Sequence, residues 1–158
     1  MQKTMDTDVL VIGAGIAGCS AALAAADAGC SVLLLTLGSG TSTSSTEYAQ
    51  RAIIYRGSKD SQAALINDIA SAGDGLCSPD ALRQIASRGP ALVKRVLVDQ
   101  LHVPFDHDAR GALHLTREAA HSAARIIHCA DTTGREIARA CWHAVRTHTR
   151  ITILENAT

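Results

Sequence analysis

The sequence predicts an α/β fold, a Rossmann-like doubly wound parallel sheet of which this chain carries a truncated part. An apolar run at residues 8–12 ends in a glycine-rich turn, which is typical of a buried parallel strand. An alanine-rich helix is expected over 16–28 and a second apolar strand over 31–36, so the three form one right-handed βαβ unit. A final strand is expected over 151–154. We take that strand to be central, so the sheet is expected to be cut short after it.

The middle of the chain is predicted to form loops and helices. Residues 38–46 are mostly Gly, Ser and Thr, a composition typical of a surface loop rich in hydrogen-bonding groups. The other expected elements are an extended segment over 48–55, helices over 61–72 and from Ser78-Pro79, a break at Gly89-Pro90, a further helix over 91–100, a hairpin over 102–115 and a helix over 135–147.

Composition and charge exclude several classes of partner. The 15 basic and 15 acidic residues balance, so no positive field attracts nucleic acid or anionic lipid. Aromatic residues make up 3% of the chain, too few for the stacking platforms of a single-strand binder. The five cysteines form no CxxC pair, which indicates reduced thiols in a cytoplasmic protein. We therefore expect a small-molecule ligand, with no nucleic acid and no membrane.

The apolar segment at residues 9–26 has an alternative interpretation as a signal peptide or membrane helix, because Lys3 precedes it. Asp6 and Asp8 stand where such a segment needs positive charge, however. Its three glycines also have the spacing of a phosphate-binding turn. We therefore favour the nucleotide-binding interpretation.

Each glycine of the turn has a mechanical role in binding a dinucleotide pyrophosphate. Gly13 permits the tight turn, Gly15 leaves the backbone open to the phosphates, and Gly18 lets the helix pack on the sheet. The helix N-terminus then offers free N–H groups and a partial positive charge. The predicted pyrophosphate-binding residues are Gly13, Ala14, Gly15, Ile16, Ala17 and Gly18.

The identity of the dinucleotide is less clear from these residues. The second strand ends in Leu35-Thr36-Leu37-Gly38, without the acidic residue that usually binds a ribose. This argues against an NAD dehydrogenase and against a flavoprotein of the glutathione-reductase type. The hydroxyl-rich loop at 38–46 could contact ribose or phosphate, or it could be a flexible surface loop, and both interpretations stay open.

Two polar groups in the second half of the chain are candidates for function. Arg117 and Glu118 follow a predicted strand, and on local evidence they form a solvated ion pair of little energetic value. His114, His121 and His128 recur every seven residues, but a metal site needs closer spacing or acidic partners. We predict no metal site.

Taken together, several motifs resemble the L-aspartate oxidases, which belong to the succinate dehydrogenase and fumarate reductase flavoprotein group. The matching segments are residues 8–18, 44–50, 114–118 with His121-Ser122, 125–128 and 130–136. The resemblance covers nearly the whole chain but only about the first third of such an enzyme. It implies that residues 1–158 are the N-terminal part of an FAD-binding domain, without the capping and C-terminal helical domains of the family.

The resemblance implies non-covalent FAD and the oxidation of L-aspartate to iminoaspartate in quinolinate and NAD biosynthesis. Oxygen or fumarate would accept the electrons, and quinolinate synthase would be a pathway partner. Glu118 matches the glutamate that orients the amino group of the substrate. The residues matched to FAD contacts outside the glycine turn are Leu37, Ser45, Thr46, Glu47, Tyr48, Ala49, Gln50, Arg51, Ala52, Asn156 and Ala157.

Differences at three places in the sequence separate this chain from other members of the group. Ser45 stands where the succinate dehydrogenase type has the histidine that bonds covalently to FAD, and no histidine lies between residues 38 and 50. Arg51-Ala52 and Ala119-Ala120 replace two glycine pairs, so we expect Arg51 to obstruct a close backbone approach. A non-catalytic remnant, a nucleotide-binding fragment or a fumarate reductase-type fragment remain alternative interpretations.

Overall fold

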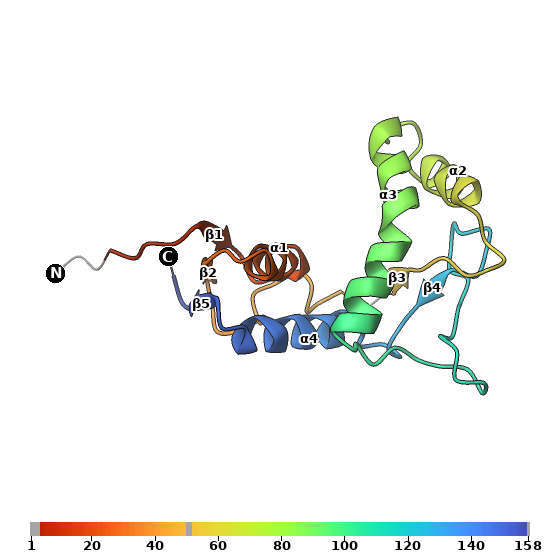
Figure 1. The fold of residues 1–158 in the computed structure, drawn as a ribbon. Helices are drawn as coiled ribbons and strands as arrows, with labels where there is room; N and C mark the ends of the chain where they lie inside the picture. The colour runs from red at the N-terminus through yellow and green to blue at the C-terminus, as the bar shows by residue number, and fades with distance from the viewer. Residues whose placement is uncertain (1–3, 50–51, 158) are drawn as a thin grey trace. The chain divides into compact units, whose positions relative to one another are not determined.

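The structure is a computed structural model that describes residues 4–49 and 52–157. The chain divides into two compact units (Figure 1). Unit 1 comprises residues 1–50 and 134–158, and unit 2 comprises residues 51–133. Each unit has its own set of secondary-structure elements and is described by itself.

Unit 1 is built on a three-stranded parallel sheet. Its strands β1 (Val9–Ile12), β2 (Val32–Leu35) and β5 (Ile151–Leu154) pair in the order β1-β2-β5. Helix α1 (Ile16–Asp27) connects the first two strands, and α4 (Thr133–Thr147) precedes the third. The predicted α/β fold with a parallel sheet is confirmed.

The helices of unit 1 cover one face of its sheet. Both crossovers run in the same direction across the sheet, so the right-handed rule places α1 and α4 on the same side, as Figure 1 shows. Leu34 is fully buried, whereas Leu10 and Ile12 are 53% and 79% exposed on the other face. Among the described residues, no second helical layer makes the sheet doubly wound.

The final strand lies where a sheet that is cut short after it would leave it. Among the described residues, β5 lies at an edge of the sheet and β2 lies in the middle. Apolar character does not separate the two positions, because strand order depends on pairings between distant segments. In the part of the chain that is described, no helix has the length and apolar character needed to cross a membrane.

Unit 2 combines helices with a two-stranded antiparallel sheet. Its elements are α2 (Gln62–Ala72), α3 (Pro79–Leu92), the π-helix η1 (Val93–Gln100), β3 (Ile53–Ile54) and β4 (Ile126–Ile127). Among the described residues of the extended segment predicted over 48–55, strand structure is confined to β3. The buried apolar side chains of this unit include Leu65, Leu82, Ala86, Leu97, Val103, Phe105, Ile126 and Ile127.

The helix break predicted at Gly89-Pro90 is wrong. Pro90 lies inside α3, and the chain continues directly into η1. Proline cannot donate to the carbonyl four residues earlier and displaces it. Here that carbonyl, of Ala86, accepts a hydrogen bond of 3.4 Å from Arg56 Nη1. A distant side chain therefore satisfies the group that the proline leaves open, and the helix persists.

The hairpin predicted over 102–115 is reduced to a single antiparallel bridge between His107 and Leu113. Its turn is nevertheless ordered, because the Asp108 carboxylate accepts the amides of Arg110 and Ala112 at 2.8 and 3.0 Å. Local turn chemistry was therefore predicted correctly, whereas the extent of strand pairing was not.

Candidate functional site

The glycine turn brings β1 and α1 into close contact. Gly13 has a φ of +105°, a conformation that favours glycine, and its N–H donates to Leu35 O at 2.8 Å. A Cβ atom at Gly18 would overlap the carbonyl oxygen of Gly13. The helix therefore starts directly on the turn, the close approach expected of the third glycine in this motif.

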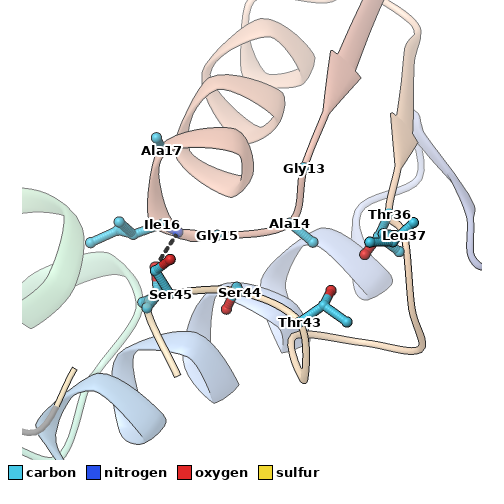
Figure 2. Close-up of a pocket in the computed structure, with 11 residues that line it drawn as sticks. Gly13, Ala14, Gly15, Ile16, Ala17, Thr36, Leu37, Thr43, Ser44 and Ser45 are labelled. Atoms are coloured by element: carbon cyan, nitrogen blue, oxygen red, sulfur yellow. Dashed lines mark hydrogen bonds between the residues drawn. The ribbon is translucent and has the colours of Figure 1, made fainter. Parts of the chain in front are cut away.

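The N-terminus of α1 is open to an anion. Its N-cap residue, Gly15, offers no side-chain hydrogen bond, and the first turn holds no acidic residue. The first N–H groups of a helix have no partner within the helix, and the helix dipole adds a partial positive charge there. The Ile16 N–H donates to the Thr46 hydroxyl at 3.0 Å (Figure 2). Thr46 thus lies directly beside the predicted phosphate position.

A pocket of 340 Å³ lies at this helix end. It opens outside the carboxyl ends of β1 and β2, where open parallel sheets bind their ligands. Figure 2 shows the glycine turn on one side and the hydroxyl-rich loop on the other. The pocket is lined by Gly13, Ala14, Gly15, Ile16, Ala17, Thr36, Leu37, Thr43, Ser44, Ser45 and Thr46.

The hydroxyl-rich loop at 38–46 is held by its own polar contacts. The Thr41 hydroxyl donates to Glu47 Oε2 at 2.5 Å, and the Gly40 N–H donates to Glu155 Oε1 at 2.7 Å. The carboxylate of Glu47 therefore holds the loop and does not line the pocket. Two interpretations were left open for this loop. Because its polar contacts hold it in place and its residues line the pocket, the structure favours a loop that faces a ligand over a flexible surface loop.

A glycine outside the predicted motif supports the same loop. A Cβ atom at Gly134, in the first turn of α4, would overlap the carbonyl oxygens of Thr46 and Ala49. The Gly134 N–H also donates to Ala49 O at 2.9 Å. The sequence analysis includes this glycine only in the matching segment 130–136, so its packing against residues 46–49 was not predicted.

The end of the chain returns to the end of β2. The Ala157 N–H donates to Thr36 O at 3.0 Å, and the Thr36 N–H donates to Leu154 O at 3.0 Å. Asn156 has a φ of +56°, which turns the backbone at this point. Asn156 and Ala157 therefore lie beside the strand end that precedes Leu37, although neither lines the pocket.

The structure brings together only some of the residues predicted to contact the cofactor. Those that line the pocket are Gly13, Ala14, Gly15, Ile16, Ala17, Leu37, Ser45 and Thr46. Those of unit 1 that lie outside its lining are Gly18, Glu47, Tyr48, Ala49, Asn156 and Ala157. Gln50 and Arg51 lie outside the described residues, and Ala52 and Glu118 belong to unit 2. Thr43 and Ser44 also line the pocket and belong to the hydroxyl-rich loop that the sequence offered as a contact of ribose or phosphate, whereas the sequence did not predict Thr36 as a pocket residue.

Cys19 lies under the glycine turn as a neutral thiol. Its side chain is fully buried, and Sγ donates to Ala14 O at 3.3 Å. Burial, and after it the nearby Cys141, raises the pKa of Cys19 to about 12. Cys19 therefore adds no negative charge that would offset the partial positive charge at the N-terminus of the helix.

Glu118 lies on a loop of unit 2 with an unusual backbone. Its carbonyl accepts the His121 N–H at 2.9 Å, which closes a tight turn. Ala119, within that turn, has a φ of +34°, a conformation that glycine adopts without strain. No ion pair joins Arg117 to Glu118 among the described ion pairs, and the described residues hold no cluster that could bind a metal ion.

Comparison with known families and proteins identifies the relatives of this chain. The model of a family described as "FAD binding domain" matches residues 8–158. The L-aspartate oxidase of Halobacterium salinarum is 43% identical over 157 residues, which cover 99% of this chain and 30% of that enzyme. L-aspartate oxidase 1 of Ralstonia nicotianae is 40% identical over 157 residues, with 96% of this chain and 28% of that enzyme covered.

The fold also matches a solved structure. The FrdA chain of E. coli quinol fumarate reductase superposes with a TM-score of 0.89 at 22% identity, over 98% of this chain and 26% of that chain. At this identity the likeness concerns the fold. The chain thus spans less than a third of the length of each of these three proteins.

Proposed function

This chain belongs to the FAD-binding domain family, and from that premise we propose that it is the FAD-binding N-terminal part of an L-aspartate oxidase. The observation that carries the proposal is the pocket between the open N-terminus of α1 and the hydroxyl-rich loop. The identity of about 40% to two L-aspartate oxidases supports the choice of enzyme. The capping and C-terminal domains of such an enzyme would be additional to residues 1–158.

The residues of the pocket fit FAD. The N-terminus of α1, which has no acidic residue in its first turn, and the absence of a side chain at Gly15 suit a pyrophosphate, and Gly18 lets the helix begin directly on the turn. The hydroxyls of Ser45 and Thr46 extend along the pocket. Asn156 and Ala157 would lie on the adenine side, beside the end of β2. Since no histidine lies between residues 38 and 50, the cofactor would be held without a covalent bond.

The reaction follows from the chemistry of the cofactor, which accepts a hydride from the substrate when bound. L-aspartate would lose that hydride from Cα and a proton from nitrogen, giving iminoaspartate, and oxygen or fumarate would then take up the two electrons. Glu118 would orient the amino group of the substrate through its carboxylate. We place this small-molecule reaction in the cytoplasm, with quinolinate synthase as the enzyme that consumes the product.

The test is to purify the chain, add FAD and measure the visible absorbance that remains after gel filtration. We expect bound flavin that acid releases, and bleaching of its absorbance by L-aspartate without oxygen. Protein that retains no flavin would overturn the cofactor assignment. Bleaching by succinate but not by L-aspartate would instead indicate a succinate dehydrogenase-type fragment.

The matched pair Thr46→Val and Thr46→Ser tests the pocket itself. The valine variant keeps the shape of the side chain but loses the hydroxyl that faces the Ile16 N–H. We expect its FAD affinity to fall about fivefold, as loss of one neutral hydrogen bond predicts, whereas the serine variant retains it. Equal affinities for the two variants would remove Thr46 from the site.

A further inference from the structure

A cluster of buried charged side chains lies in unit 2. The Arg125 side chain is fully buried, and its Nε and Nη2 each donate to an Asp60 oxygen at 2.7 Å. Its Nη1 donates to Asp68 as well. The Asp60 side chain is 1% exposed and that of Asp68 is 13% exposed. This cluster ties α2, which contains Asp68, to the segment that leads into β4.

Asp68 gathers hydrogen bonds from three donors on a single oxygen. The amide and the hydroxyl of Ser122 both donate to Asp68 Oδ2 at 2.8 Å, and Arg125 is the third donor. The Ser122 amide bond, together with the Ser122 hydroxyl and Arg125, outweighs desolvation and lowers the pKa of Asp68 to about 2. The carboxylate therefore stays ionised and holds Ser122 in place throughout the neutral range.

The segment held in this way is the loop that carries Glu118. The loop is closed at its base, where the Thr116 N–H donates to Ile126 O at 2.9 Å. Within it, the His121 N–H donates to Glu118 O, and Ser122 follows directly. The turn that begins at Glu118 is thus fixed at its start by the strand bridge and at its end by Asp68.

His121 adds a second contact between the turn and the cluster. Its Nδ1 lies 3.2 Å from Arg125 Nη1. A guanidinium can only donate, so Nδ1 accepts, and a neutral His121 carries its proton on Nε2. The tautomer of His121 therefore reports on the same buried cluster.

We propose that Asp68 is a positioning residue for Glu118, acting through the amide and hydroxyl of Ser122. The proposal rests on the proposed function only for the role of Glu118, since the geometry of the loop stands without it. Neither Asp68 nor Ser122 contacts the glycine-turn pocket of unit 1.

The experiment measures amide hydrogen exchange and trypsin cleavage after the exposed Arg117 in the full chain. We expect Asp68→Asn to speed both by about tenfold, the effect of weakening a hydrogen bond to a charged group. Asp99→Asn, which removes the carboxylate of an exposed ion pair in the same unit, serves as the matched control. No change in the loop of Asp68→Asn would overturn the proposal.

A second pair of variants tests the hydroxyl even if Asp68→Asn does not fold. Ser122→Thr keeps the hydroxyl, whereas Ser122→Val has the same shape without it. We expect wild-type exchange in the loop for the threonine variant and faster exchange for the valine variant, with exchange in α3 unchanged in both. The ¹⁵N shifts should show His121 protonated on Nε2 in the wild type, with that preference reduced in Asp68→Asn. Identical loops in the two Ser122 variants would overturn the proposal.

FAD binding separates this inference from the proposed function. All variants should bind FAD as the wild type does, because Asp68, Asp99 and Ser122 neither line the pocket nor belong to the residues matched to FAD contacts. If the wild type binds no FAD but Asp68→Asn still loosens the loop, the proposed function fails and the positioning role of Asp68 stands. If the wild type binds FAD but the loop of Asp68→Asn is unaltered, the positioning role fails and the proposed function stands.

Discussion

The two units of this chain hold distant segments together in different ways. In unit 1 the backbone segments approach closely because glycine leaves room, at Gly18 against Gly13 and at Gly134 against residues 46–49. In unit 2 a buried guanidinium, that of Arg125, ties together two carboxylates and a loop.

The difference follows from the length of the strands. Unit 1 has four-residue parallel strands, whose carboxyl ends meet at one edge without help from side chains. The strands of unit 2 are two residues long, too short to hold a loop by backbone pairing alone. Unit 1 places a helix N-terminus beside a pocket, whereas the charged groups of the cluster in unit 2 bind one another.

The largest effect is expected from removing the buried cation. Arg125→Met would leave the Asp60 carboxylate buried without its partner, which costs about 3–5 kcal/mol of the free energy of unfolding. Urea denaturation measures this loss of stability. The stability of Arg125→Lys should lie between those of the wild type and Arg125→Met, because lysine keeps the charge but loses the paired geometry. Arg139→Met, which breaks an ion pair on α4, should cost less than about 1 kcal/mol. Equal losses of stability in Arg125→Met and Arg139→Met would mean that the buried cluster contributes no more to the free energy of unfolding than an exposed ion pair does.

The next effect is expected at the close approach in unit 1. Gly18→Ala would force α1 away from the Gly13 carbonyl, at a cost of about 1–3 kcal/mol and with loss of FAD binding. Gly89→Ala is the matched control, because its Cβ would meet only Ile85 Cγ2 at 3.9 Å and helix propensity favours alanine by about 1 kcal/mol. Thermal unfolding measures the stability of the two variants, and flavin retention measures their FAD binding. Full FAD retention by Gly18→Ala would contradict the close-packing argument.

A smaller and opposite effect is expected in the loop of unit 2. Ala119→Gly would relieve the strain of a positive φ and raise the free energy of unfolding by about 0.5–1 kcal/mol. Ala120→Gly next to it changes a residue that has no positive φ, so it should give no gain. Chemical denaturation of both variants measures their free energies of unfolding. Equal values for Ala119→Gly and Ala120→Gly would show that the backbone at Ala119 carries no strain.

The smallest effect is expected from pH. Because the folded pKa of Asp68 lies near 2, below its value in the unfolded chain, the stability that it contributes is present above about pH 4 and is lost as pH falls through 2. Exchange of the Ser122 amide, corrected for its intrinsic rate, should therefore change little between pH 7 and pH 4. Loosening of the loop at pH 5 in the wild type that is absent from Asp68→Asn would contradict the lowered pKa, because loosening that comes from His121 would occur in both proteins.

The sequence predicted the βαβ unit and its glycine turn because both depend on neighbouring residues. It failed at Gly89-Pro90, where the local rule does not include the hydrogen bond from Arg56 to the carbonyl of Ala86, two residues that are thirty positions apart in the chain. It also carried no sign that Asp60, Asp68 and Arg125 would meet, since 57 to 65 residues separate the carboxylates from the guanidinium.

The sequence by itself determined the parallel sheet, the glycine turn at the start of the helix and the absence of a histidine in the hydroxyl-rich loop, and its resemblance to the L-aspartate oxidases indicated FAD as the cofactor. Strand periodicity and glycine spacing are local properties, so they can be recognised in the sequence. Only the tertiary structure decided that β5 lies at an edge, that Gly134 supports the pocket wall and that Asp68 holds the turn of Glu118. Each of these depends on contacts between segments far apart in the chain, which no local pattern encodes.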